Sequence, residues 1–162
     1  MSYSNLKNMA LALLLAAGAV TTAQADDHGS KGPTVPPSPK YLQECAACHI
    51  AYPVGMLPAA SWQHLMGSLN KHYGTDASLD AASQRDISDW LKANAGTYKR
   101  VSEAPPQDRI TQSAWFLRKH RDGEVPAGVW KRASVGSAAN CAACHPQAAQ
   151  GRFSEHDIRI PK

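Results

Sequence analysis

The chain has 162 residues, with 17 lysines and arginines against 13 aspartates and glutamates, so its formal net charge is +4. This length allows one domain or two small ones. The basic residues form no cluster larger than short groups such as Arg118–Arg121, which disfavours a nucleic-acid-binding protein. Only two phenylalanines and four tryptophans are present, so the apolar core is thin for this length.

Residues 1–25 are predicted to be a cleaved secretory signal peptide. Lys7 provides the positive charge, Met9–Val20 is apolar, and Ala23–Ala25 fits the small-x-small pattern for cleavage. The apolar run is shorter than the about 20 residues that span a bilayer, which favours this interpretation over an uncleaved anchor. The mature chain would begin at Asp26 and be exported to the periplasm, with no other stretch able to span a membrane.

The mature chain opens with a polar, Pro-rich leader at residues 26–40, which we expect to be extended. Residues 41–48 then begin a short helical turn, and residues 50–60 form an irregular loop because they contain two prolines and a glycine. The next segment, 61–73, predicts an amphipathic helix with Ser61 as its N-cap.

The phase of this helix separates two histidines. At 100° per residue, His72 falls on the same side as Trp62 and the apolar residues, whereas His64 falls on the opposite, solvent side. Gly74 is expected to end the helix.

A second helix is predicted from a cap at Ser78 or Asp80 to about Asn94, followed by a break in composition at 103–108. Its buried face consists of Ile87, Trp90 and Leu91. We place a boundary at this break, which gives a first unit at 41–102 and a second at 103–162.

In the second unit, residues 111–121 predict a helix that places His120 on the same face as Phe116 and Leu117. Residues 125–136 are loop-like, with Trp130 as an anchor, and a further short helix is expected at 137–150. No alternation typical of strands appears, so the fold is predicted to be mostly α with long loops.

The pentapeptide Cys-Ala-Ala-Cys-His occurs twice, at Cys45–His49 and at Cys141–His145, and uses every cysteine in the chain. In a C-x-x-C-H site the two thiols can add to the two vinyl groups of a haem, and the histidine can then coordinate the iron. The motifs therefore predict two covalently attached haem c groups. The fold class becomes two small c-type haem-binding units that share a haem-filled core, which compensates for the thin apolar core.

Three other roles are known for paired cysteines: a zinc site, disulfides and a C-x-x-C redox pair. Zinc sites use paired cysteines, but the pairs are usually about 12–20 residues apart, whereas these lie near opposite ends of the mature chain. Zinc also gives no reason for a histidine after each pair. Disulfides or C-x-x-C redox pairs suit an exported protein, although the latter lack a βαβ context. Haem attachment is favoured over all three.

His49 and His145 are the predicted proximal ligands, and His72 and His120 the predicted distal ones, because each of these two lies on an apolar face. His28 falls in the leader, His64 faces solvent and His156 lies in a polar tail. Methionine ligation is an alternative for the first haem only, since no methionine follows residue 66. The candidates for it are Met56 and Met66.

The chain resembles the bacterial periplasmic dihaem cytochrome c family. The residues that carry the resemblance are ECAACH at 44–49, HYG at 72–74, FLRKH at 116–120, NCAACHPQAAQGRF at 140–153 and the closing Ile160-Pro161. The resemblance implies thioether bonds at Cys45, Cys48, Cys141 and Cys144, proximal His49 and His145, and distal His72 and His120. It also implies a membrane b-type cytochrome as partner and, in some bacteria, a small soluble monohaem cytochrome.

These residues predict an electron carrier in which two bis-histidine haems cycle between Fe(III) and Fe(II), with no catalytic residue. The alternative is a haem enzyme or gas-binding protein in which one distal site is open or labile. The sequence leaves open which distal histidine serves which haem.

Overall fold

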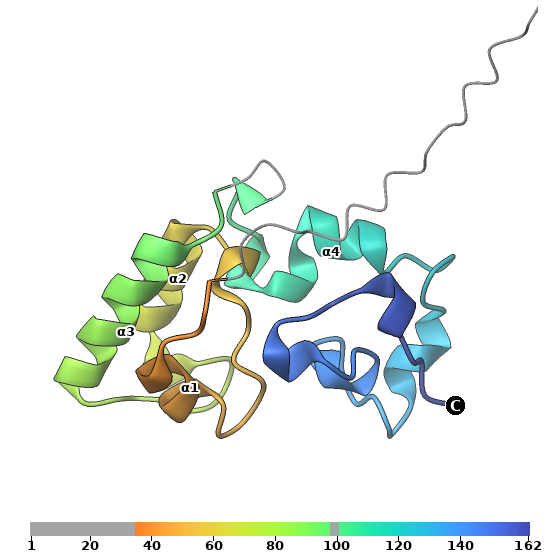
Figure 1. The fold of residues 1–162 in the computed structure, drawn as a ribbon, viewed down its shortest axis with the longest axis horizontal. Coiled ribbons are helices and arrows are strands. Elements are labelled where there is room, and N and C mark those ends of the chain that lie inside the picture. Colours follow the sequence, from red (N-terminus) through yellow and green to blue (C-terminus); the bar gives the residue numbers. More distant parts are fainter. Residues whose placement is uncertain (1–34, 98–100) are drawn as a thin grey trace, which may run out of the picture.

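The computed structural model describes residues 35–97 and 101–162 (Figure 1). Over these residues the chain forms α-helices, short 3₁₀ helices and loops, without a β-strand. The prediction of a mostly α fold with long loops is confirmed. The signal peptide and most of the leader lie outside the described residues. No helix within the described ranges is long and apolar enough to cross a membrane.

The α-helices and the 3₁₀ helices divide unevenly between the two halves of the chain. The α-helices are α1 (Pro39–Cys45), α2 (Ala59–Gly67), α3 (Ala81–Asn94) and α4 (Ala114–Lys119). The 3₁₀ helices are η1 (Val54–Met56), η2 (Leu69–Lys71), η4 (Pro106–Asp108), η5 (Ile110–Gln112), η6 (Ala127–Lys131), η7 (Cys141–Ala143), η8 (Ala148–Gln150) and η9 (Glu155–Asp157). Helices α1, α2 and α3 gather in the first half, and α4 with most of the 3₁₀ helices forms the second half (Figure 1).

The core of the first half lies where α2 and α3 pack side by side and α1 packs against α3 (Figure 1). Its most deeply buried side chains are Leu57, Ile87 and Leu91, each 1% exposed. The Trp62 indole N–H donates to the Val54 carbonyl at 2.8 Å, so the buried polar atom is satisfied. Asp80 caps α3 by accepting from two backbone N–H groups, which confirms the second helix. Of its predicted buried face, Ile87 and Leu91 are buried and Trp90 is half-buried.

Two helix starts differ from the prediction. Helix α1 begins at Pro39, inside the segment that we assigned to the leader, because proline is favourable in the first turn, where its missing N–H would be unpaired anyway. Helix α2 begins at Ala59 after Pro58, so Ser61 is not its N-cap but a fully buried residue in its first turn.

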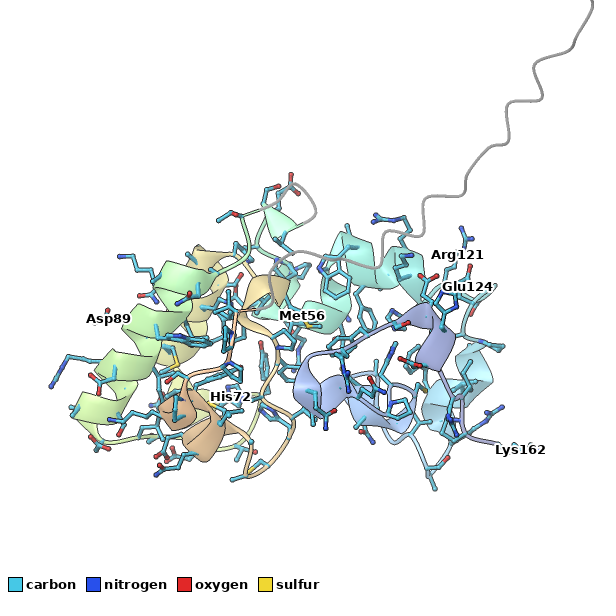
Figure 2. The ribbon with its side chains drawn as sticks, viewed as in Figure 1. Met56, His72, Asp89, Arg121, Glu124 and Lys162 are labelled. Carbon is cyan, nitrogen blue, oxygen red and sulfur yellow. The ribbon has the colours of Figure 1, made fainter. Side chains whose placement is uncertain are left out.

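The predicted helix 61–73 is wrong at its C-terminal end. Helix α2 ends at Gly67, and the Ser68 hydroxyl donates to the His64 carbonyl, which takes the place of a continuing helical bond. His72 therefore lies beyond η2 and not on a face of α2 (Figure 2). It opens a tight turn in which Tyr73 and Gly74 both have positive φ, and the Thr75 N–H donates to the His72 carbonyl at 3.1 Å.

The second half is built mainly from 3₁₀ helices and loops. The predicted helix 111–121 is interrupted at Ser113, which caps the short helix α4 by accepting from the Phe116 N–H. The motif at residue 141 lies on the 3₁₀ helix η7 and not on an α-helix. The division at residue 103 stays a prediction, because η4 of the second unit contacts α2 of the first.

Candidate haem-binding sites

The two C-x-x-C-H motifs lie on tight helical turns. Cys45 is the last residue of α1, and Cys141 is the first residue of η7. None of the four cysteines forms a disulfide. Burial, aided by Glu44, raises the pKa of the Cys45 thiol to about 11, and burial also raises the pKa of Cys141. Redox-active C-x-x-C pairs have lowered thiol pKa values, whereas burial raises the pKa values of these two thiols.

Each motif histidine faces one distant histidine across a fixed gap. The ring centroids of His49 and His72 are 6.2 Å apart, and those of His120 and His145 are also 6.2 Å apart. The structure therefore places His72 opposite the first motif and His120 opposite the second. Neither pair crosses between the halves, a point that the sequence left open.

This spacing is the one that a single metal ion requires. Two imidazoles on opposite faces of one iron, with metal–nitrogen distances of about 2.0–2.1 Å, place their ring centroids about 6.3 Å apart. Such a pair fits the two axial positions of a haem iron. Within residues 35–97 and 101–162, no cluster of three or more His, Cys, Asp or Glu side chains is placed to hold a metal ion.

The ring nitrogens also fit axial ligation. The Nδ1 atoms of His49 and His120 are hydrogen-bonded to the carbonyls of Ile50 at 2.7 Å and Phe116 at 3.0 Å, which leaves Nε2 of each ring to face a metal. The Nδ1 atoms of His72 and His145 are buried and have no hydrogen-bond partner in the protein. Each opposed pair thus combines one anchored imidazole with one whose second nitrogen has no protein partner.

Burial disfavours the charged form of the two less anchored imidazoles. Burial lowers the pKa of His72, and the neighbouring His49 and Arg109 lower it further. Burial and the neighbouring His120 likewise lower the pKa of His145. Only neutral imidazole can donate a lone pair to a metal, so the shifts favour the form that coordinates iron.

Aromatic rings hold the histidines in place. His120, the C-cap of α4, stacks on Phe116 with ring centroids 3.9 Å apart and also lies near Trp130 at 6.0 Å. Tyr73 lies beside His72 at 5.0 Å and is itself covered by the Arg109 guanidinium at 4.0 Å. These contacts limit the rotation of the distal rings.

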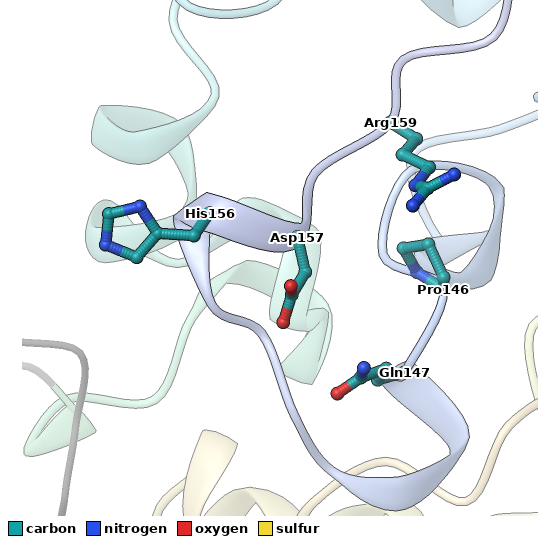
Figure 3. A pocket seen from close by; sticks show the side chains of 5 residues that line it. All are labelled: Pro146, Gln147, His156, Asp157 and Arg159. Atoms are coloured by element: carbon teal, nitrogen blue, oxygen red, sulfur yellow. The ribbon is translucent and has the colours of Figure 1, made fainter.

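The other candidate ligands lie elsewhere. His64 is exposed and pairs with Asp108 at 3.5 Å, consistent with its predicted solvent-facing position. Met66 is buried in the core with α3. His156 is exposed, and its side chain points away from those of Asp157 and Arg159, with which it lines a polar pocket after the second motif (Figure 3). His28 lies outside the described residues.

No sequence pattern indicates a role for Tyr52. Its ring stacks on His49 with centroids 4.9 Å apart, and its hydroxyl donates to the carbonyl of Ala139 in the second half. Burial, with Cys141 and Tyr73 nearby, raises the pKa of Tyr52 to about 12. The sequence does show an aromatic residue three positions after the first motif. Its hydrogen-bond partner, Ala139, lies 87 residues further along the chain, and no periodicity links the two.

Two C-x-x-C-H motifs, each with a second histidine at the spacing of one iron, define a dihaem c-type cytochrome. The comparison with protein families agrees, because the model described as dihaem cytochrome c matches residues 41–153. The chain belongs to the dihaem cytochrome c family and carries two covalently bound haem c groups. No curated protein sequence matched the chain.

Solved structures of dihaem cytochromes are similar to this chain. The crystal structure of DHC from Rhodobacter sphaeroides is 45% identical, with a TM-score of 0.63, and the match covers 74% of this chain and 99% of that one. A second structure described as diheme cytochrome c from Rhodobacter sphaeroides is 42% identical, with a TM-score of 0.65 and the same coverage. The diheme cytochrome sb-DHC from Shewanella baltica OS155 is 34% identical, with a TM-score of 0.67, covering 78% and 95%.

The turn that places His72 gives the first testable prediction. Gly74 has a φ of +97°, and a Cβ there would meet nothing within 4 Å, so only the backbone conformation opposes a side chain. We expect Gly74→Ala to destabilise the haem-loaded protein by about 1–2 kcal/mol. Thermal unfolding followed in the haem absorbance measures this change. Gly123→Ala is the control, since it has equal space and no positive φ. Equal melting temperatures of the two variants would contradict the prediction.

Proposed function

We propose that the chain is an electron carrier whose two haems each take two histidine ligands. The observation that supports this most directly is the pair of opposed imidazoles at each site, 6.2 Å apart in both. In the proposal the haems are attached through Cys45, Cys48, Cys141 and Cys144, and the axial ligands are His49 with His72 and His145 with His120. When bound, each haem supplies one-electron Fe(III)/Fe(II) chemistry.

The protein contributes position and environment. An imidazole on each side of the iron leaves no position at which a substrate can bind, so the site is suited to passing electrons and not to catalysis. Two nitrogen ligands lack the thioether that raises the potential of His/Met cytochromes, and we therefore expect lower potentials. The hydrogen bonds from Nδ1 of His49 and His120 to backbone carbonyls fix those rings and increase their basicity.

One observation favours the alternative of a gas-binding or catalytic haem, and it concerns the first site alone. His72 is held by a four-residue turn, and its Nδ1 has no protein partner. His120 is held by both the ring and the carbonyl of Phe116. A labile distal ligand would therefore be His72 and not His120.

Carbon monoxide distinguishes a closed site from an open one. We expect the ferrous protein to keep its visible spectrum when CO is added, because both sixth positions are taken. His72→Met and His120→Met should keep both haems attached, and each should alter the spectrum or CO response of one haem.

His64→Met is the matched control for these variants, since His64 is exposed and should leave both haems unchanged. A high-spin band or a CO-shifted Soret band in the unaltered protein would refute the closed carrier. If the high-spin or CO-shifted band of the unaltered protein disappears in His72→Met and persists in His120→Met, the gas-binding alternative at the first haem is supported.

The planes of the opposed imidazoles predict two different ferric signals. The rings of His49 and His72 are inclined by 28°, whereas those of His120 and His145 are inclined by 70°. Near-parallel axial imidazoles split the iron d orbitals strongly, and near-perpendicular ones leave them almost degenerate. Electron paramagnetic resonance of the oxidised protein should therefore show one rhombic and one highly anisotropic low-spin signal, in equal amounts. Two identical signals would contradict this assignment.

We further propose a periplasmic location, which the predicted signal peptide at residues 1–25 supports. The proposed partners are a membrane b-type cytochrome and a soluble monohaem cytochrome, and they rest on the family resemblance. We expect the tagged holoprotein to co-purify with a haem b protein from detergent-solubilised membranes of its own host. An unrelated tagged c-type cytochrome of similar charge is the control, and equal recovery of haem b with both would contradict the partnership.

A further inference from the structure

One side chain contacts the machinery of both haem sites. The Tyr52 ring lies on His49, with centroids 4.9 Å apart and planes inclined by 27°. Its hydroxyl donates to the Ala139 carbonyl at 2.8 Å. Ala139 lies two residues before Cys141, so Tyr52 joins an axial ligand of the first haem to the attachment segment of the second.

The Ala139 carbonyl is a shared acceptor. It receives the Cys141 backbone N–H at 3.0 Å, and the Cys141 sulfur also lies 3.6 Å from it. Tyr52 and Cys141 are therefore hydrogen-bonded to one oxygen atom. A change in the position of this oxygen is transmitted directly to the backbone that carries the second haem.

Tyr52 is itself held firmly. The hydroxyl of Tyr41, a residue only 3% exposed, donates to the Tyr52 carbonyl at 2.8 Å. The next residue, Pro53, has a fixed φ and lies close to the second half, where a Cβ built on Gly151 would be 3.7 Å from its ring. A ring anchored on both sides can orient its neighbours, whereas a mobile surface tyrosine cannot.

We propose that Tyr52 is a positioning residue that couples the two haem sites. Its ring sets the plane of His49, and its hydroxyl fixes the segment before Cys141, so the two attachment motifs are held in one arrangement. The inference rests on the proposed histidine ligation of the first haem. It predicts that a single side chain in the first half affects the spectroscopic signature of the haem in the second.

The test separates the hydroxyl from the ring. Tyr52→Phe keeps the ring and removes the hydrogen bond. In the proton NMR spectrum of the oxidised protein, it should therefore move the haem-methyl resonances of the second haem. The electron paramagnetic resonance signal of the first haem should stay unchanged. Tyr52→Leu removes both contacts and should also shift or broaden the signal of the first haem. The His72→Met and His120→Met variants assign each signal to its haem, and mass spectrometry checks that both haems are attached.

Tyr73→Phe is the matched control. The Tyr73 hydroxyl also donates to a carbonyl beyond the first unit, that of Gln107 at 2.9 Å, and its ring also lies beside an axial candidate, His72. This bond does not reach the second motif, so Tyr73→Phe should leave the second haem unchanged.

Unchanged resonances of the second haem in Tyr52→Phe, or equal shifts in Tyr52→Phe and Tyr73→Phe, would overturn the proposal. Because Tyr52→Phe preserves size and shape, this comparison decides the matter even where Tyr52→Leu fails to load its haems. Failure of the proposed ligation would be recognised separately, by a high-spin or CO-sensitive haem in the unaltered protein.

Discussion

The 6.2 Å spacing between the two imidazoles of each opposed pair is the constraint on which the rest of this structure depends. In the proposed ligation, metal–nitrogen distances tolerate errors of about 0.2 Å, so the four histidine rings must be placed accurately. The chain meets this demand with very short elements. His72 opens a tight turn, His120 caps a helix of six residues, His49 follows the seven-residue helix α1, and His145 follows the 3₁₀ helix η7. Each of these elements is closed by backbone hydrogen bonds over a few residues, which fixes the ring positions locally.

The two sites reach the same spacing by different means. In the first, the motif histidine is anchored to a neighbouring carbonyl and stacked on Tyr52, while the distal His72 depends on its turn and on Tyr73. In the second, the distal His120 is the anchored partner, through Phe116. The ring planes differ as well, by 28° in one pair and 70° in the other. Hydrogen bonding and ring orientation both affect the iron, so the protein has a physical basis for giving the two haems different properties.

The apolar packing is uneven between the two halves, and we therefore expect the haems to stabilise the fold. The first half has a core of apolar side chains between α2 and α3, but the second half buries few large ones, chiefly Phe116, Val129 and Val135. Its 3₁₀ helices and loops satisfy their backbone groups locally and bury little apolar surface. A covalently attached macrocycle supplies apolar area at the place where the polypeptide provides least. Two hydrogen bonds join the well-packed first half to the second half, which buries fewer large side chains. They run from Tyr52 to Ala139 and from Tyr73 to Gln107.

The sequence alone determined the chemistry of this protein, because haem attachment requires cysteines and a histidine at a fixed local spacing that can be read directly. It also predicted helix α3 with a cap at Ser78 or Asp80, of which the structure has Asp80, and correctly placed His64 in solvent. The prediction that His72 lies on the apolar face of a helix over residues 61–73 was wrong. That helix ends at Gly67, where the Ser68 side chain replaces the helical hydrogen bond. Only the tertiary structure decided which histidines face each other and that Tyr52 reaches the second motif. Those contacts join residues 23 to 87 positions apart, and local periodicity carries no information over such separations.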